Sequence, residues 1–425
     1  MPIPLITLGI SEGFSAIPYA DTATKLAAVA AVIAALKYYF GGARNPAERV
    51  MHSKVVLVTG GTSGIGASIV YELASRGAQI ILLTQHPPTD VFLADYIQDL
   101  RDATNNQLIY AEQVNLRSLH SVRQFATKWV DNSTPRRLDM VVLCAGTQSP
   151  KTPGLTEDGL VEDWQVTYLA HAHLLSILSP AIRAQPPDRD VRILVATCSS
   201  YLRGELDFGS LEKLTTDTTD STSDKKEKKD KKDPKNKKDQ KEKKKKPADL
   251  YATAKLALMI FAHNFQKHLT TAIKRGDESR PVNTRVLLVD PGYSRTPGMR
   301  RWLTGGSLWG LLLYLLTWPI WWLILKSPQQ GAQSFLWAAM ESPTALFSSR
   351  GPVEEGSATK KEEGGWLIKE CRRMKFLRED VTDEAVGKKL WEFSEKQIEA
   401  KEKESALRRA KEKKKKKGEK EKKQK

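Results

Sequence analysis

The feature that most constrains the fold is a strand, turn and helix pattern that begins at Lys54. Residues 54–60 (KVVLVTG) form a short, β-branched apolar run, the helix-forming stretch SGIGASIVYELASRG follows, and residues 78–84 (AQIILLT) form a second apolar run. Short, fully apolar strands are typical of a parallel sheet that is covered on both faces. The order strand, glycine-rich turn, helix, strand therefore predicts a βαβ unit.

Three further apolar runs repeat this pattern along the chain. They lie at 138–144 (LDMVVLC), 191–197 (VRILVAT) and 284–290 (TRVLLVD), and helical stretches separate them. Strands that alternate with helices in this way form an open parallel sheet. The sequence therefore predicts an α/β domain, a doubly wound parallel sheet of the Rossmann type, over residues 51–300.

The positive charge of the chain is concentrated in two lysine-rich tracts. Residues 225–246 and 401–425 each contain 14 basic and five acidic residues, and together they exceed the formal net charge of +17. Such tracts are typical of solvated, disordered segments. Neither tract contains the interleaved aromatic residues that stack on bases, so we do not expect nucleic acid as a partner.

Composition divides the rest of the chain around the domain. We expect residues 214–247 to form a disordered lysine-rich insertion and residues 398–425 a disordered basic tail. Residues 1–50 are an apolar N-terminal segment and 301–326 a hydrophobic membrane segment. Residues 327–397 are expected to complete the domain as its helical C-terminal part.

Two apolar segments indicate contact with a lipid surface. Residues 307–325 are 19 almost wholly apolar residues with four tryptophans and no charge. Because Pro319 breaks a helix, we expect this segment to form a hairpin or bend in one leaflet. The shorter run at 26–36 is open to two interpretations, an N-terminal anchor that extends to residue 40 or a buried amphipathic helix.

Cysteine and histidine spacing gives no pattern for a metal site. The three cysteines form no CxxC pair, which favours a reducing compartment and indicates neither a zinc site nor a disulfide framework. His171 and His173 lie two residues apart on a predicted helix and therefore face different sides. We expect both to be packing or surface residues.

Two motifs carry chemistry. In Thr59–Gly66 (TGGTSGIG), the glycines allow a tight turn and let the backbone approach a pyrophosphate at the helix N-terminus. Tyr251 and Lys255 (YATAK) lie on one face of a predicted helix. A tyrosine pKa is about 10 in water, and a nearby ammonium lowers it. Such a pair can transfer the proton that accompanies hydride transfer.

The motifs TGxxxGIG, LDxVVxxAG, YxxxK and PGxxxT, in this order, resemble the short-chain dehydrogenase/reductase superfamily. The stretches YATAKLALMIF, SPQQGAQSFLWAAM and KLWEFSEK resemble its retinol dehydrogenase and WW-domain oxidoreductase branch, as a membrane-associated, fungal-type member. The resemblance covers residues 51–397 without the lysine-rich insertion. It implies a Rossmann fold, an NAD(P)(H) cofactor and hydride transfer between that cofactor and a carbonyl or alcohol.

The resemblance also implies the roles of individual residues. Tyr251 would be the general acid/base, and Lys255 would lower its pKa and hold the nicotinamide ribose. Thr296 would lie near the nicotinamide carboxamide, and Asn115 takes the place of the family's usual aspartate near the adenine. The residues implied to bind the cofactor are Gly60, Ser63, Gly64, Ile65, Gly66, Asn115, Ala145, Gly146, Tyr251, Lys255, Pro291, Gly292 and Thr296.

Three positions depart from the family pattern. Leu143-Cys144 stands where the family has two asparagines before Ala-Gly, and Thr167 replaces the asparagine that supports the proton relay. The catalytic serine aligns without gaps to Cys198, with a shift of one to Ser199 and with a shift of two to Ser200. Because a thiol is a poorer hydrogen-bond partner for a carbonyl oxygen, we predict Ser199.

Together these features predict an oxidoreductase that interconverts a lipophilic carbonyl and alcohol, such as a retinoid, a sterol or a fatty aldehyde or ketone. We expect it at the cytosolic face of the endoplasmic reticulum or at a lipid droplet, with a homodimer as one expected assembly. Leu83–His86 after the second strand contains no carboxylate to repel a 2′-phosphate, which favours NADP over NAD but leaves NAD open. The alternative is a catalytically weak dinucleotide-binding scaffold or redox sensor at a membrane, as the departures at Thr167 and Cys198 and the insertion suggest.

Overall fold

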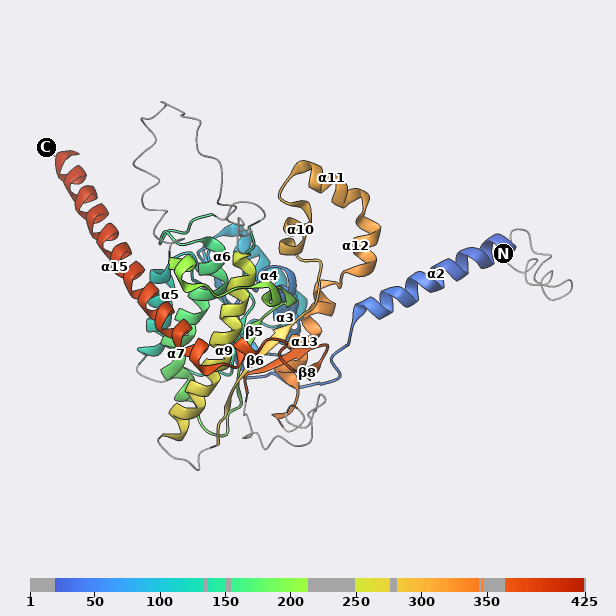
Figure 1. Ribbon diagram of the computed structural model, residues 1–425, viewed down its shortest axis with the longest axis horizontal. Helices are drawn as coiled ribbons and strands as arrows, with labels where there is room; N and C mark the ends of the chain where they lie inside the picture. Colours follow the sequence, from blue (N-terminus) through green and yellow to red (C-terminus); the bar gives the residue numbers. More distant parts are fainter. Residues whose placement is uncertain are drawn as a thin grey trace, which may run out of the picture.

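The computed structural model describes most of the chain (Figure 1). The described residues are 20–132, 136–149, 154–212, 249–275, 281–343, 346 and 364–423. The expected insertion at 214–247 therefore lies outside the described residues.

A twisted sheet forms the centre of the molecule. Within the described residues it has eight strands in the order β3-β2-β1-β4-β5-β6-β7-β8. All neighbouring strands are parallel except β7 and β8. The strands are β1 (Val55–Thr59), β2 (Gln79–Thr84), β3 (Ile109–Gln113), β4 (Met140–Leu143), β5 (Val191–Ala196), β6 (Thr284–Asp290), β7 (Trp366–Lys369) and β8 (Arg372–Met374). The five apolar runs coincide with β1, β2, β4, β5 and β6, so the predicted α/β sheet is confirmed.

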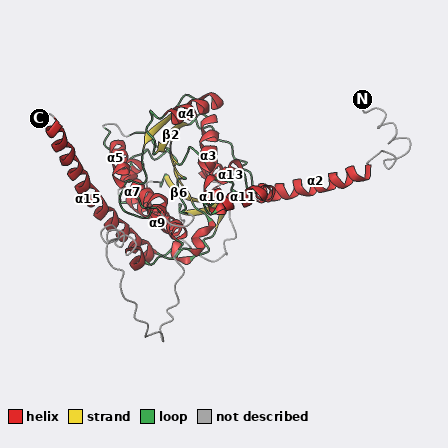
Figure 2. Ribbon diagram, turned by 90° about the horizontal axis from the view of Figure 1, so that it is seen from above, coloured by secondary structure: helices red, strands yellow, loops and turns green. Residues whose placement is uncertain are grey.

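Helices cover both faces of the sheet, as Figure 2 shows from above. One face packs on α3 (Gly64–Ser75), α4 (Val91–Thr104) and α13 (Pro328–Met340). The other packs on α5 (Leu119–Val130), α7 (Ala170–Arg183), α9 (Leu250–Lys274) and α15 (Glu384–Lys423). Short helical elements connect these parts. α6 (Glu162–Trp164) and the π-helix η2 (Gln165–Leu169) precede α7, η3 (Ser199–Arg203) follows β5, and η4 (Glu379–Val381) precedes α15. Side chains from the two layers fill two cores, one on each face of the sheet.

Three strands were not expected from the sequence. β3 lies at the edge of the sheet and exposes Tyr110, so its residues do not form a fully apolar run. β7 and β8 contain only four and three residues, which is too short for a hydrophobic period to show. Residues 327–397, expected to complete the domain as its helical C-terminal part, thus also extend the sheet by β7 and β8.

The first part of the expected disordered tail is instead packed on the body. Ile398, Lys401 and Ser405 are buried along α15, one helical turn apart. Arg123 of α5 donates a charge-assisted hydrogen bond to Glu402, 2.6 Å from its Nε to Glu402 Oε1. The tail therefore begins later than the predicted residue 398. The high lysine content of the C-terminus hid, at the level of sequence, the apolar and acidic side chains with which α15 packs on the body.

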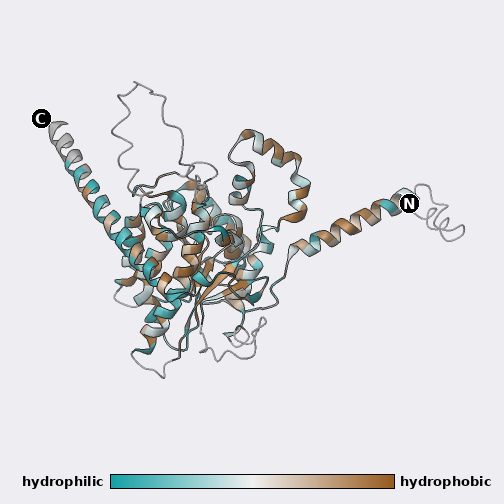
Figure 3. Ribbon diagram, viewed as in Figure 1, coloured by the Kyte–Doolittle hydropathy of each residue, from teal (hydrophilic) through white to brown (hydrophobic). Residues whose placement is uncertain are grey.

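Two apolar elements stand out from this body (Figure 3). α2 (Ala20–Gly41) is, among the described residues, the one helix that is long and apolar enough to cross a membrane. The 307–325 segment is not one helix, since α11 (Leu308–Leu316) ends before α12 (Trp318–Ile324), which carries Pro319 in its first turn. The break at Pro319 agrees with the expected bend. Together with α10 (Pro297–Thr304), these short helices leave large apolar side chains exposed.

Candidate active site

The glycine-rich turn lies against two distant segments of the chain. Gly60 has φ 68°, and a methyl group there would lie 2.8 Å from the backbone nitrogen of Ala145. Gly64 has φ 58°, and a methyl group there would lie 3.3 Å from the side chain of Thr296. These segments follow β1, β4 and β6, whose carboxyl ends share one edge of the sheet. The fold thus gathers the predicted cofactor-binding segments around the glycine-rich turn, and we call this group of backbone segments the cradle.

Tyr251 lies in the first turn of α9, which Asp249 caps by accepting a hydrogen bond from the Ala252 backbone at 3.1 Å. Its hydroxyl contacts the thiol of Cys198, with 3.8 Å between Sγ and oxygen. Burial, with a smaller contribution from Cys198, raises the pKa of Tyr251 well above its ordinary value. The phenol is therefore protonated at neutral pH, and the expected effect of Lys255 on this pKa stays a prediction.

Lys255 lies one turn after Tyr251 on the same face of α9, as the spacing predicts. Its Nζ is 5.8 Å from the Tyr251 ring centroid and donates a hydrogen bond to the Ala196 carbonyl at 2.9 Å. Burial lowers the pKa of Lys255, while Cys198, Cys144 and Asp290 act in the opposite direction. A methyl group on Gly146 would lie 3.7 Å from this ammonium.

Thr167 lies on the π-helix η2, a distortion that is frequent at functional sites. Its hydroxyl is 3.3 Å from both the backbone nitrogen and the carbonyl oxygen of Thr147. Its own carbonyl faces Nδ1 of His171 at 3.2 Å, and Nε2 of His171 faces the Thr59 hydroxyl at 3.2 Å. The Thr59 hydroxyl also accepts a hydrogen bond from the Ala145 backbone at 3.3 Å. His171 therefore connects the proton-relay position to the glycine-rich turn.

The sequence predicted a packing or surface position for His171, and its hydrogen bonds could not have been inferred from spacing. It is fully buried. Burial, and secondarily the charge of Lys255, lowers the pKa of His171 to about 4. The imidazole is therefore neutral at physiological pH.

Comparison with known proteins agrees with this geometry. Residues 54–184 match the family described as short chain dehydrogenase. The chain is 39% identical over 414 residues to the uncharacterized oxidoreductase pbr1 of Schizosaccharomyces pombe, which covers 97% of this chain and 99% of the relative. The chain belongs to the short-chain dehydrogenase/reductase superfamily. It is an oxidoreductase that acts on CH–OH groups with NAD(P).

The chain is also similar to a human enzyme and to a solved structure. Human retinol dehydrogenase 13 is 27% identical over 327 residues, with 76% of this chain and 83% of the relative covered. This supports a retinol dehydrogenase-like branch. The structure of an uncharacterized protein from Mycobacterium Paratuberculosis covers 82% of this chain and 94% of its own, with a TM-score of 0.50 and 19% identity. That likeness concerns the fold alone.

The catalytic role predicted for Ser199 stays a prediction. Its hydroxyl donates a hydrogen bond to Asp290 at 3.1 Å, whereas the Tyr251 hydroxyl contacts Cys198. Lys369 of β7 forms an ion pair with the same carboxylate at 3.1 Å. The geometry therefore favours Cys198 over Ser199 opposite the tyrosine. Asp290 and Lys369 were missed, because β7 was not expected and Asp290 matches no motif.

The remaining predicted cofactor residues occupy two places. Ser63 is the N-cap of α3, and residues 64–66 form the first turn of that helix. Gly292 has φ 73°, and its backbone nitrogen donates a hydrogen bond to Asp290 at 2.9 Å, so the turn with Pro291 is fixed by a buried carboxylate. Thr296 caps α10 by accepting from the Met299 backbone at 3.2 Å.

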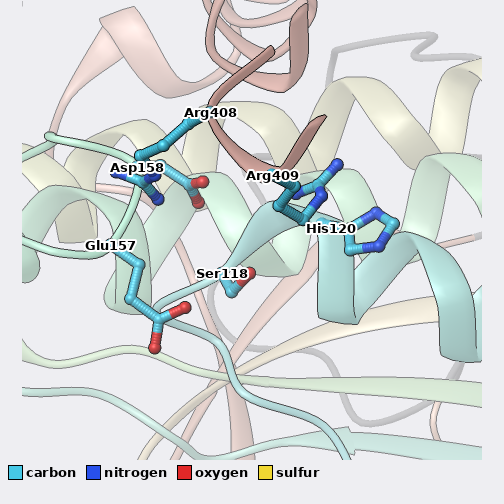
Figure 4. A pocket seen from close by; sticks show the side chains of 6 residues that line it. All are labelled: Ser118, His120, Glu157, Asp158, Arg408 and Arg409. Atoms are coloured by element: carbon cyan, nitrogen blue, oxygen red, sulfur yellow. The ribbon is translucent and has the colours of Figure 1, made fainter. Parts of the chain in front are cut away.

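Asn115 lies farther along the sheet, and its role near the adenine stays a prediction. Its amide donates a hydrogen bond to Glu157 at 3.1 Å and its carbonyl accepts from the Arg117 backbone at 3.0 Å. Beside it lies a cavity of about 550 Å³, and Figure 4 shows side chains that line it. Its lining includes Glu157 and, from α15, Arg408 and Arg409, but not Tyr251 or the glycine-rich turn. The cavity is therefore separate from the candidate active site.

Proposed function

We propose that this oxidoreductase interconverts a lipophilic carbonyl and alcohol with NADP(H) at a membrane surface. The substrate class includes retinoids, sterols and fatty aldehydes or ketones, and the expected surface is the cytosolic face of the endoplasmic reticulum or a lipid droplet. One observation carries the proposal. The 291–296 loop of the candidate active site continues directly into α10, α11 and α12, whose apolar side chains are exposed. An apolar substrate would thus meet an apolar surface beside the site.

The residues around Tyr251 support proton transfer to a carbonyl oxygen. Tyr251 is protonated at neutral pH, so its hydroxyl can donate in reduction and accept in oxidation. Cys198, or Ser199 after a shift of the strand end, would hold the carbonyl oxygen. Lys255 and Thr167 would orient the tyrosine and the ribose. The nicotinamide cofactor, when bound, supplies or accepts the hydride.

The cradle fits the dinucleotide that this chemistry requires. α3 begins at Gly64, and the backbone N–H groups at this helix N-terminus can stabilise a pyrophosphate. Gly60 and Gly66 let the turn pack closely on neighbouring backbone. Ser63, Ile65, Ala145 and Gly146 would line the same cradle, with Asn115 on the adenine side. Pro291, Gly292 and Thr296 would lie against the nicotinamide. Gln85 and His86 follow β2 and are exposed, which supports NADP.

The detergent-solubilised full chain tests this proposal in an assay of NADPH and NADH oxidation with a panel of lipophilic carbonyls. We expect turnover with NADPH and at least one member of the panel. Tyr251→Phe should lower kcat by at least about a hundredfold while cofactor affinity changes little, because only the proton donor is lost. Cofactor binding without turnover on any panel member would instead support the scaffold or sensor alternative.

A further inference from the structure

The two apolar elements of this protein meet, although 285 residues separate them in sequence. The Lys37 ammonium of α2 donates hydrogen bonds to the carbonyls of Trp322 at 2.5 Å and Leu325 at 3.3 Å, at the end of α12. The same ammonium lies 4.9 Å from the Trp322 ring centroid. Figures 1 and 3 show α2 and the α10–α12 segment leaving the body on the same side. α2 and the α10–α12 segment can therefore insert into the same apolar layer.

The length of α2 and the polarity of its far end both match a lipid bilayer. α2 has 22 residues, a rise of about 33 Å, which matches a hydrocarbon thickness of about 30 Å. Its far end is polar, with an ion pair between Asp21 and Lys25 at 2.8 Å, and this end requires water beyond the apolar layer. A bilayer provides water on both sides, whereas a droplet monolayer does not. α11 and α12, with nine and seven residues, are too short to cross and fit one leaflet.

Lys326 lies where α12 returns to the active-site loop. Its backbone nitrogen donates to the Tyr293 carbonyl at 2.9 Å, and its carbonyl accepts from the Arg295 backbone at 2.9 Å. Its side chain is only 11% exposed and lies over Gly292, where a methyl group would be 3.2 Å from the ammonium. Lys326 thus contacts the loop through both backbone and side chain.

Glu370, in the turn between β7 and β8, completes this junction. One carboxylate oxygen forms an ion pair with Lys326. The other accepts a hydrogen bond from the backbone nitrogen of Ala43, just after α2, at 2.7 Å. Gly42 has φ 73°, and both charged side chains pack so closely on it that a methyl group there would overlap them. The ends of α2 and α12, the sheet edge and Gly292 therefore meet at one ion pair.

We propose that α2 and α10–α12 form a single bilayer-binding surface, and that the Lys326–Glu370 pair positions the 291–296 loop relative to it. Attachment to the bilayer then orders the loop that lies against the nicotinamide position. Lys326 and Glu370 are positioning residues, since neither is placed to touch the substrate. The inference rests on the proposed membrane-associated function and adds its regulation by the lipid surface.

Hydrogen exchange of the full chain tests this proposal without any substrate. The protein is compared in vesicles of phosphatidylcholine and phosphatidylserine and in detergent, and vesicle binding is measured by flotation. The variants are Lys326→Met and Glu370→Gln, of which the second keeps the acceptor for Ala43. Lys267→Met is the matched control, since it also removes a lysine–glutamate pair, that of Lys267 and Glu384 at 2.9 Å.

In vesicles, we expect the amides of residues 292–296 to exchange about tenfold faster in both junction variants than in the wild type and the control. All proteins should float with the vesicles, and β1 should stay protected, which shows an intact fold. The wild type in detergent should exchange as fast in this loop as the variants do.

Three results would each overturn the proposal. The first is loop exchange of the wild type that is equal in vesicles and in detergent. The second is loop exchange that is unchanged in Glu370→Gln, and the third is wild-type protein that does not float with the vesicles. A protein that floats and shows the expected exchange but reduces no lipophilic carbonyl would contradict the proposed function and leave the junction supported.

Discussion

At the scale of residues, the candidate site combines a protonated tyrosine with a thiol. Tyr251 faces Cys198, and the hydroxyl of Ser199 is bonded to Asp290. A thiol donates only a weak hydrogen bond, so it would hold a carbonyl oxygen less firmly than a hydroxyl does. The identity of the side chain opposite Tyr251 therefore sets how well a substrate carbonyl is polarised.

Substitutions at Cys198 and Ser199 separate their roles. Cys198→Ser should raise kcat with a lipophilic carbonyl, about two- to tenfold, because a hydroxyl replaces the weaker donor. Cys198→Ala should lower kcat, whereas Ser199→Ala should mainly lower the unfolding temperature, since it leaves Asp290 with fewer donors. Steady-state kinetics and thermal unfolding of the three variants measure this. A large loss of kcat in Ser199→Ala alone would restore Ser199 as the catalytic hydroxyl.

His171 makes a stability prediction that depends on pH. Its folded pKa is lowered to about 4, so below the unfolded value near 6.5 the unfolded chain binds a proton that the folded chain does not. The stability from the neutral imidazole is therefore present above pH 6.5 and lost as pH falls toward 4. The loss is on the order of 3 kcal/mol. His171→Gln should flatten the pH dependence of the unfolding free energy over this range, and denaturant titrations at several pH values would show it. An unchanged slope would contradict a buried neutral histidine.

At the scale of elements, α15 is part of the folded body rather than an appendage. Trp164 donates a hydrogen bond to Gln397 at 2.9 Å, and the hydroxyls of Tyr168 and Ser394 are 2.6 Å apart. Farther along the helix, Glu402 pairs with His173 at 3.2 Å. Because these contacts cover α6, η2 and α7, the helix stabilises the elements that carry Thr167 and His171.

Two truncations test where the structural part of α15 ends. A chain that ends at Ala410 should keep the wild-type unfolding temperature, since the removed residues are mainly lysines. A chain that ends at Gln397 should be less stable by at least about 2 kcal/mol, because it loses buried Ile398 and the Glu402 pairs. Thermal unfolding in detergent compares the two. Equal stability of both would mean that the tail begins at residue 398 after all.

At the scale of the whole molecule, the folded body and the apolar elements differ in how much apolar surface they expose. The sheet and its helices bury their apolar side chains, whereas those of α2 and α11 remain exposed. Exposed apolar surface of this extent marks a membrane or protein contact. Arg300 and Arg301 precede the second element, are exposed and can meet lipid head groups.

Membrane fractionation assigns the anchor. One variant carries serine or glutamine at the apolar positions of α11 and α12, which are Leu311, Leu312, Leu315, Leu316 and Ile320, and a matched variant carries serine at Val29, Val32 and Ile33 of α2. Each side chain is at least 40% exposed, so the substitutions should spare the core. We expect each variant to shift toward the soluble fraction and the combined variant to be largely soluble. Soluble wild-type protein would contradict membrane attachment altogether.

The sequence alone determined five strands of the sheet, β1, β2, β4, β5 and β6, because these are continuous apolar runs separated by helical stretches. It also located the glycine-rich turn and the Tyr251–Lys255 pair, since their chemistry depends on local spacing. Only the tertiary structure decided which groups meet. The contact of Cys198 with Tyr251, the bond of Ser199 to Asp290 and the bridge through His171 depend on where β5, β6 and η2 end relative to one another. The contacts of Lys37 with Trp322 and of Ala43 with Glu370 join segments hundreds of residues apart, and no local pattern encodes such contacts.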